Sequence, residues 1–195
     1  MISFIGAGKV GIALGVYFKE KGCYIGGYYN RTTEHAVMAS EITKSKVFAT
    51  IEELMSESSM VWITVSDDAL PELAQDIAQK KIPPNIEAFV HTSGAHSSGV
   101  LQPIQEAGFA TYCAHPLMAF SDIAESIKQL RKTYFTLDST NDEIGTFKLQ
   151  YLEHFFKQIG NNTLYVDADK KELYHCAAAV LSNYMVTLLN LSYEM

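Results

Sequence analysis

The feature that most restricts the fold of this chain is a glycine pattern directly after a short apolar segment. Residues 2–5 are typical of a β-strand, and the next six residues spell G-x-G-x-x-G, namely Gly6, Ala7, Gly8, Lys9, Val10 and Gly11. From Val10 onward, apolar residues recur at helical spacing as far as Lys21, which predicts a helix with one apolar face. The glycine pattern therefore joins a strand to a helix.

The three glycines of this pattern each meet a different physical requirement. Gly6 allows a tight turn out of the strand, Gly8 lets phosphate groups approach the backbone, and Gly11 lets the helix pack closely. Bound phosphates would accept hydrogen bonds from the free N–H groups of the first helical turn, where the helix dipole is positive. We therefore predict that residues 6–11 bind the diphosphate of a dinucleotide. The alternative is an ordinary glycine-rich turn.

The end of the second predicted strand, at residues 24–29, distinguishes between two dinucleotides. An acidic residue about 20 positions after the glycine pattern binds the ribose 2′-hydroxyl of NAD, but this sequence has Asn30, Arg31 and Thr32 there. These side chains suit a 2′-phosphate, because each can donate hydrogen bonds to it and the guanidinium is charged. The sequence therefore predicts NADP rather than NAD. The alternative is that Arg31 is an ordinary solvated charge.

Composition and charge argue against several other classes of protein. The 195 residues carry a net charge of -7 without a cluster of Lys and Arg, so we expect no nucleic-acid partner. The three cysteines form no C-x-x-C pair, which favours free thiols in a reducing cytoplasm. No signal peptide is recognisable, and the apolar run at 176–191 is shorter than the roughly 20 residues that a membrane span needs. We therefore expect a cytoplasmic protein without membrane contact.

Further strands are predicted along the chain. The strongest lies at residues 60–65, and others lie at 86–91 and 110–114. Strands that alternate with helices predict an α/β fold with a doubly wound, mostly parallel sheet. In such a sheet, ligands bind at the carboxyl ends of the strands. The candidate site residues at these ends are Val65, Ser66, Asp67, Thr92, Ser93 and His115. Alternatively, Asp67 only caps a helix and Ser93 only closes a turn.

The final segment has a different composition from the rest of the chain. Residues 177–191 continue apolar without Gly or Pro, which predicts a helix that is apolar on several faces and needs partners. We therefore divide the chain into a dinucleotide-binding domain at 1–166 and the first helix of an α-helical domain at 167–195. We expect this second domain to be truncated or to be completed by another subunit, in a homodimer that forms through these helices.

With these residues in hand, the chain resembles the superfamily of 6-phosphogluconate dehydrogenase, pyrroline-5-carboxylate reductase and prephenate dehydrogenase. It is most similar to a group of bacterial Rossmann-like proteins with a C-terminal domain of formerly unknown function, some of which are linked to ketopantoate reduction. The resemblance covers 1–166 as the cofactor domain and 170–195 as the opening of the helical domain. Its motifs are Gly6–Gly11, Asn30–Thr32, Val65–Asp68, His91–Ala95 and His115–Leu117.

The resemblance implies roles for four catalytic candidates. His115, followed by proline, is similar to the histidine of prephenate dehydrogenases that contacts the oxygen at the reacting carbon, and imidazole can give and recover a proton. Alternatively, it is a structural histidine at a strand end. Ser93 would be a second donor. Asn183 matches an asparagine of hydroxyacid and phosphogluconate dehydrogenases, but Ala179 stands where those enzymes have a catalytic lysine. His175, or His115, would take that role.

We therefore expect an NADPH-dependent oxidoreductase that reduces a small 2-oxo acid, with ketopantoate as the leading candidate by resemblance. The enzymatic alternatives are an imine reductase and a prephenate-type dehydrogenase. An alternative of another class is a regulatory protein that senses NADP(H) without catalysis. His91, His96, Cys113 and His115 lack the paired spacing that is typical of zinc ligands, so we predict no metal site.

Overall fold

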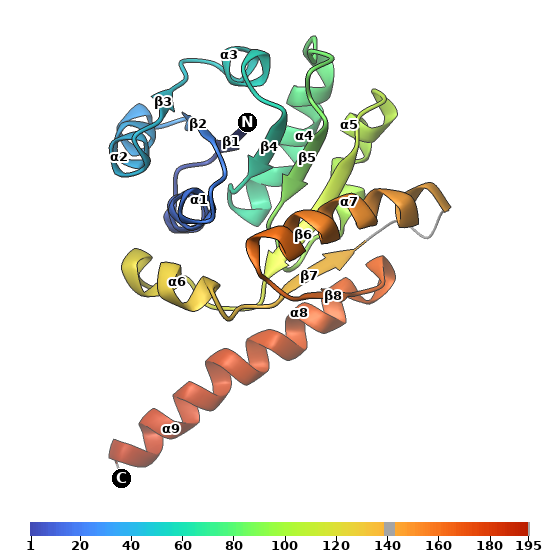
Figure 1. Ribbon diagram of the computed structural model, residues 1–195. Helices are drawn as coiled ribbons and strands as arrows, with labels where there is room; N and C mark the ends of the chain where they lie inside the picture. Colours follow the sequence, from blue (N-terminus) through green and yellow to red (C-terminus); the bar gives the residue numbers. More distant parts are fainter. Residues whose placement is uncertain (139–142, 195) are drawn as a thin grey trace.

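The computed structural model of the protein describes residues 1–138 and 143–194, and leaves undescribed the side chains of residues 143–148, 182 and 183. Figure 1 shows a central twisted sheet with helices packed on both faces and a long C-terminal helix that leaves the body of the molecule. This arrangement is a doubly wound α/β fold, which confirms the fold class predicted from the sequence.

The sheet has the order β3-β2-β1-β4-β5-β6-β7-β8. Its described strands are β1 (Ile2–Ile5), β2 (Ile25–Tyr29), β3 (Lys46–Val47), β4 (Met60–Ile63), β5 (Ala88–His91), β6 (Thr111–Pro116), β7 (Phe135–Asp138) and β8 (Thr163–Tyr165). Every pair of neighbours is parallel except β6 and β7, which are antiparallel. The chain begins with β1 and adds β2 and β3 on one side of it. It then returns to the other side of β1, where β4 to β8 follow in order, so the strand order switches between β1 and β4. In doubly wound sheets, such a switch point is where the ligand crevice opens.

The helices cover the sheet from both sides. The described α-helices are α1 (Lys9–Glu20), α2 (Thr33–Thr43), α3 (Ile51–Ser56), α4 (Leu70–Gln79), α5 (Gln102–Glu106), α6 (Ile123–Leu130), α7 (Glu143–Ile159), α8 (Lys171–Ala179) and α9 (Met185–Glu194). The sequence predictions did not include α5 or α6. Both are short, and α6 starts at Asp122, whose carboxylate accepts a hydrogen bond from Glu125 N at 2.9 Å. Helices of one or two turns contain too few apolar residues for their helical spacing to be recognised in the sequence.

Two apolar cores, one on each face, hold the sheet between the helices. On one face, Tyr17 of α1 and Phe156 of α7 belong to the core around Trp62 of β4, whose ring centroid is 6.2 Å from that of Phe156. On the other face, α3, α4 and α5 contribute residues such as Ile77 to a second core. All four residues of β4 are buried, as expected of a parallel strand that is covered on both sides.

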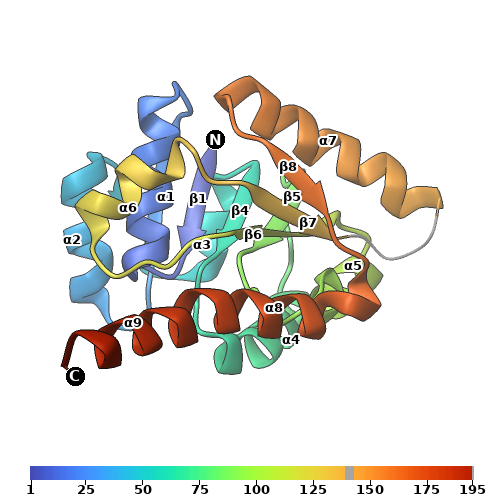
Figure 2. The same cartoon turned by 90° about the horizontal axis from the view of Figure 1, so that it is seen from below.

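The C-terminal helix contributes little to these cores. It consists of α8, a π-helical turn at Val180–Tyr184 and α9. Lys171 is the buried residue of α8, and none of the residues described in α9 is buried. Figure 1 shows the helix leaving the sheet near β8 and ending well beyond the other elements, and Figure 2 shows its course along one side of the molecule. Within the described ranges, no helix is both long enough and apolar enough to cross a membrane.

Candidate functional site

The glycine loop between β1 and α1 has no room for side chains at its two ends. Gly6 has a φ angle of +106°, and a Cβ there would lie 2.6 Å from the carbonyl oxygen of Thr64. A Cβ on Gly11 would lie 2.4 Å from the carbonyl oxygen of Gly6. Both distances are shorter than a van der Waals contact, and a positive φ favours glycine. The loop is therefore packed tightly against the residue that follows β4.

Gly8, in the middle of the loop, faces open space instead. Apart from its own chain neighbours, no described atom lies within 4 Å of the position that its Cβ would take. Gly8 is the N-cap of α1, and its carbonyl accepts the hydrogen bond from Ile12 N at 3.0 Å. The N–H groups of Lys9, Val10 and Gly11 precede this bond and have no acceptor within the helix. A diphosphate fits this loop, because it can approach Gly8 and accept hydrogen bonds from these groups.

The polar segment after β2 holds the glycine loop in place. Asn30 Oδ1 accepts a hydrogen bond from Ala7 N at 3.1 Å, and Asn30 Nδ2 donates to the carbonyl of Thr32 at 2.9 Å. The amide of Asn30 thus ties the loop to the end of β2, a supporting role that the sequence did not indicate. Arg31 and Thr32 are exposed at the start of α2, and Thr32 makes no side-chain capping bond. Their side chains remain accessible to a ligand at this edge.

Lys9 connects the glycine loop to a segment distant in the sequence. Its Nζ donates a hydrogen bond to the carbonyl of Ser121 at 2.6 Å, so the loop between β6 and α6 lies beside the start of α1. Met118 and Phe120 of this β6–α6 loop line the cavity described next. The loop therefore forms one wall of the site, which the sequence did not predict.

A cavity of about 140 Å³ lies next to the glycine loop, where α1 begins and β4, β5 and β6 end. The lining residues are Val10, Val65, Asp67, Thr92, Ser93, Gly94, His115, Pro116, Met118 and Phe120. Several residues predicted from separate motifs thus meet at one place: Val10, Val65, Asp67, Thr92, Ser93 and His115. Ser66 is exposed and is not part of the lining. The cavity has the size and position of a small polar site beside a dinucleotide.

His115 projects from the end of β6 into this cavity. Its Nδ1 lies 3.2 Å from the hydroxyl oxygen of Tyr174 on α8, and its ring centroid lies 6.0 Å from that of His175. Burial lowers the pKa of His115 to about 4, and the positive charge of Lys171 acts in the same direction. At neutral pH the imidazole is therefore neutral, with a proton on only one of its two nitrogens.

Gly94 separates the two histidines of the site. A Cβ at this position would lie 2.4 Å from His175 Nδ1 and 2.8 Å from His115 Nε2. His175 Nδ1 is buried and has no hydrogen-bond partner among the described residues. The absence of a side chain at Gly94 is thus what allows α8 to bring His175 close to the end of β6. The sequence placed Gly94 in a turn at the end of a strand, within the motif His91–Ala95, but it did not indicate that this glycine makes room for His175.

Ser93 closes a turn and also lines the cavity. Its Oγ accepts hydrogen bonds from Ala95 N at 3.2 Å and from His96 N at 2.9 Å. These two bonds occupy the acceptor sites of the hydroxyl and leave its proton free to be donated. Both roles that the sequence left open for Ser93, a turn residue and a donor to a ligand, are therefore compatible in this geometry.

His91, which lies beneath the cavity, is held in one tautomer. Its Nδ1 accepts a hydrogen bond from Ser93 N at 3.2 Å, so the proton is on Nε2, which faces the carbonyl of Ser97 at 3.1 Å. Burial lowers the pKa of His91 to about 4. Across the described residues, no three His, Cys, Asp or Glu side chains gather in a way that could hold a metal ion.

A buried ion pair, which the sequence did not indicate, anchors the long helix below the site. Lys171 Nζ lies 3.0 Å from Asp138 Oδ2 and 3.1 Å from Cys113 Sγ. Antiparallel pairing of β6 with β7 sets Cys113 opposite Asp138, so one ammonium group reaches both. The fourth catalytic candidate, Asn183, lies in the π-helical turn, and its side chain is outside the described residues.

Sequence comparisons agree with this architecture. The profile of the Rossmann-like domain family matches residues 1–116, and that of a domain of unknown function, DUF2520, matches residues 133–195. The chain therefore belongs to the Rossmann-like domain family. No curated protein matches it in sequence.

Solved structures with a similar fold include Thermotoga maritima protein TM1727, at 23% identity and a TM-score of 0.73, covering 100% of this chain and 68% of that one. Prephenate dehydrogenase from Aquifex aeolicus is 14% identical with a TM-score of 0.72, covering 93% and 65%. An imine reductase from Myxococcus stipitatus in complex with NADP+ is 16% identical with a TM-score of 0.69, covering 98% and 63%. These similarities show that the chain shares the fold of these proteins.

Proposed function

We propose that this protein is an NADPH-dependent reductase of a small 2-oxo acid, with a ketopantoate-like substrate as the leading candidate. The main support for the proposal is that the glycine loop and the cavity adjoin each other. Val10 belongs both to the glycine loop and to the lining of the cavity that holds Ser93 and His115. A dinucleotide whose diphosphate lies on Gly8 therefore has its other end within reach of this cavity.

The cofactor proposal is NADP rather than NAD. Arg31 and Thr32 are exposed at the end of β2, beside the glycine loop that Asn30 supports. A guanidinium there can bind a 2′-phosphate with charge-assisted hydrogen bonds, and no acidic side chain stands at this place to bind a free ribose hydroxyl. The imine reductase from Myxococcus stipitatus, which has a similar fold, was solved with NADP+. When bound, the reduced nicotinamide supplies the hydride.

The residues of the cavity supply what a carbonyl needs as it becomes an alcohol. The hydroxyl proton of Ser93 and the Nε2 proton of His115 are donors for the substrate oxygen, where negative charge develops. His175, whose buried Nδ1 has no partner among the described residues, lies beside Gly94 of the cavity lining. Asn183 would contact the substrate from the same helix. Asp67 borders the cavity and would bind a ribose hydroxyl.

Two enzymatic alternatives use the same site. An imine reductase would need a proton for the substrate nitrogen, and a prephenate-type dehydrogenase would run hydride transfer toward the cofactor. Similar folds are known for both activities. A rival of another class is a regulatory protein that senses NADP(H) without catalysis. The polar lining of the cavity favours an enzyme, because a sensor needs only the cofactor groove.

One experiment separates these functions. Oxidation of NADPH should be measured with the full-length protein and a panel of 2-oxo acids and cyclic imines, and reduction of NADP+ should be measured with prephenate. Turnover of 2-oxo acids that is lost in Ser93→Ala and His115→Asn would support the proposal, and turnover of imines alone would support the first alternative. Binding of NADPH without turnover of any compound would support the sensor.

We also propose that the long helix forms a homodimer with a second copy of the chain. Its exposed apolar side chains recur at helical spacing, as in Val180, Tyr184, Leu188 and Leu191, and exposed apolar surface of this extent is typical of an interface. Sedimentation of the full-length protein tests this. A dimer that Leu188→Glu converts to a monomer would support the proposal, whereas a monomeric wild type would contradict it.

A further inference from the structure

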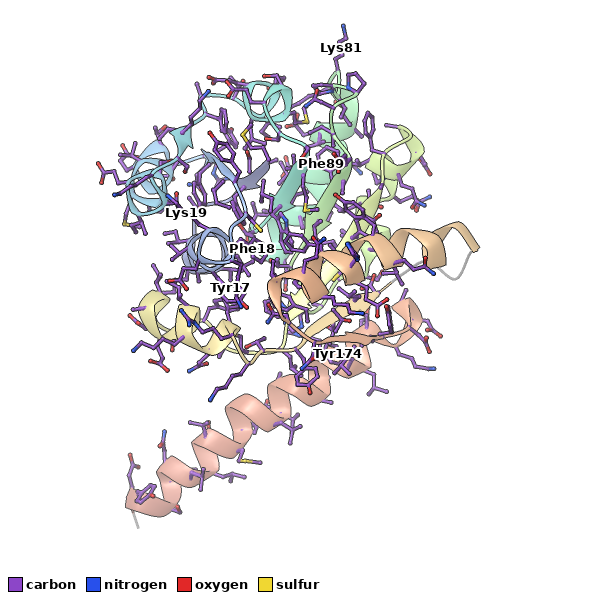
Figure 3. All side chains as sticks on the ribbon, viewed as in Figure 1. Tyr17, Phe18, Lys19, Lys81, Phe89 and Tyr174 are labelled. Atoms are coloured by element: carbon purple, nitrogen blue, oxygen red, sulfur yellow. The ribbon has the colours of Figure 1, made fainter. Side chains whose placement is uncertain are left out.

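We infer that Tyr174 is a positioning residue that passes protons from solvent to His115 during the proposed reduction. The inference deepens the proposed function and rests on it. It begins with one contact, in which the Tyr174 hydroxyl oxygen lies 3.2 Å from His115 Nδ1. Tyr174, labelled in Figure 3, stands on the first turns of the long helix, so this contact joins α8 to the end of β6.

The two nitrogens of His115 have different surroundings. Nδ1 meets the Tyr174 hydroxyl, and Nε2 lies beside Gly94, which also lines the cavity. A tyrosine hydroxyl that donates to Nδ1 leaves the imidazole proton on Nε2. Burial raises the pKa of Tyr174, so its hydroxyl keeps a proton that it can donate. With the hydrogen bond in this direction, the imidazole presents a donor to the substrate.

A neutral imidazole needs such a partner in order to act as an acid. The pKa of His115 is lowered to about 4, so at neutral pH the ring carries a single proton. Loss of that proton alone would leave an imidazolate, which is a very strong base. If Nδ1 gains a proton as Nε2 loses one, the ring stays neutral throughout. Tyr174 is the described side chain that is in position to supply this proton.

The proposed step balances in atoms and charge. When bound, NADPH would supply the hydride that adds to the carbonyl carbon, and the π electron pair of the carbonyl would pass to the oxygen. Oxygen takes the proton of His115 Nε2, His115 Nδ1 takes the proton of Tyr174, and the phenolate takes a proton from water. The carbonyl is reduced to an alcohol, NADPH is oxidised to NADP+, and one proton is consumed from solvent.

Water has a route to Tyr174 that does not pass through the substrate cavity. Tyr174 also lines a second, open hollow of about 360 Å³ between the end of β8 and α8. Tyr165 and Lys170 border the same hollow. Tyr174 thus lies between the substrate cavity and the open hollow. Its hydroxyl contacts His115, which lines the cavity, and Tyr174 itself lines the hollow. The substrate can be enclosed while protons enter from the opposite side.

The test compares Tyr174→Phe with Tyr165→Phe, which removes a hydroxyl from the same hollow but not from His115. Single-turnover oxidation of bound NADPH by a 2-oxo acid should slow about a hundredfold in Tyr174→Phe, the lower end of what proton transfer by a positioned side chain contributes. It should change little in Tyr165→Phe, and KM for NADPH should be unchanged in both. In mixtures of H2O and D2O, the wild-type rate should fall along a curve that reflects two protons in motion, and the Tyr174→Phe rate should fall linearly.

A second measurement does not depend on activity. Imidazole ¹⁵N NMR of the full-length protein without substrate should show His115 protonated at Nε2, with Nδ1 as a hydrogen-bonded acceptor whose shift moves in Tyr174→Phe. A proton on His115 Nδ1 in the wild type would overturn the relay, and so would wild-type kinetics in Tyr174→Phe. In both cases an active wild type would leave the proposed function standing. A wild type that turns over no substrate would overturn the proposed function and the relay with it.

Discussion

Lys171 Nζ lies 3.0 Å from Asp138 Oδ2, with 1% of the lysine side chain and 0% of the aspartate side chain exposed. Burial opposes the charge of Lys171, but Cys113 and Asp138 more than offset it and raise the pKa of the lysine. Asp138 Oδ1 accepts a hydrogen bond from Ser98 N at 2.7 Å. This pair joins the first turn of α8 to the end of β7, and it therefore fixes the helix that carries Tyr174 and His175.

Replacement of Lys171 by Met should destabilise the protein, because it leaves the buried carboxylate of Asp138 without its counter-charge. Loss of one partner of a buried pair costs about 3–5 kcal/mol. In the double variant Lys171→Met with Asp138→Asn, the free energy of unfolding should recover part of this loss. Denaturant unfolding of the two single variants and the double variant measures the coupling. Additive effects would show that the pair does not act as a unit.

Two glycines of the same loop should respond differently to alanine. A Cβ at Gly11 would overlap the carbonyl of Gly6, whereas a Cβ at Gly8 would meet open space. Gly11→Ala should therefore lower the free energy of unfolding by about 1–3 kcal/mol, as other overpacked sites do. Gly8→Ala should cost no more than about 1 kcal/mol, because glycine is the better N-cap.

Gly8→Ala should weaken the binding of NADPH, although it destabilises the protein less than Gly11→Ala does. Gly8→Ala places a methyl group where the diphosphate approaches, and loss of one hydrogen bond to a charged group costs about 1.5–3 kcal/mol, which is at least about tenfold in affinity. Fluorescence titration of folded Gly8→Ala protein measures this loss. Undiminished affinity would place the diphosphate elsewhere.

The glycine loop also shows how far the sequence could predict the site. Gly6, Gly8 and Gly11 were recognisable because they lie within six consecutive positions of the chain and their spacing has a physical meaning. The strand ends at Ser93 and His115 were recognisable because a doubly wound sheet places all such ends along one edge. Local patterns and one rule of topology therefore predicted most of the cavity lining.

The contacts made by α8 could not be predicted in the same way. Lys171 sits in an Asp-Lys-Lys segment that is typical of a solvated helix start, and its burial follows from where β7 ends. Tyr174 meets His115 across 59 positions, and Gly94 admits His175 only because α8 packs there. The sequence carries no local signal for such contacts, since they depend on the angle at which a helix crosses a sheet.

The free energy of unfolding should decrease below neutral pH, because His91 is buried in its neutral form. Its pKa is about 4 in the folded protein and about 6.5 in the unfolded chain. Between these values the unfolded chain binds the extra proton, so stability is complete above pH 6.5 and is lost as pH falls toward 4. The shift corresponds to at most about 3 kcal/mol.

Urea unfolding at pH 7.5 and pH 5 measures this loss. His91→Gln removes one of two buried histidines whose pKa is lowered to about 4, the other being His115. It should therefore reduce the pH dependence without abolishing it, although it lowers stability at pH 7.5. His35→Gln is the matched control, because His35 is exposed and should leave the pH dependence unchanged. An equal pH dependence in the wild type and His91→Gln would assign the effect to other groups.

Arg31→Ala should remove the preference for NADPH. A guanidinium that binds the 2′-phosphate contributes about 1.5–3 kcal/mol through hydrogen bonds to a charged group, so affinity for NADPH should fall roughly 10- to 100-fold. Affinity for NADH should change little, because NADH lacks this phosphate. Arg131→Ala removes the only other arginine in the sequence, which pairs with Glu20 at 2.9 Å, and it should leave both affinities unchanged. If Arg31→Ala retained the wild-type ratio of NADPH to NADH affinity, Arg31 would not bind the 2′-phosphate and the cofactor proposal would lose its main support.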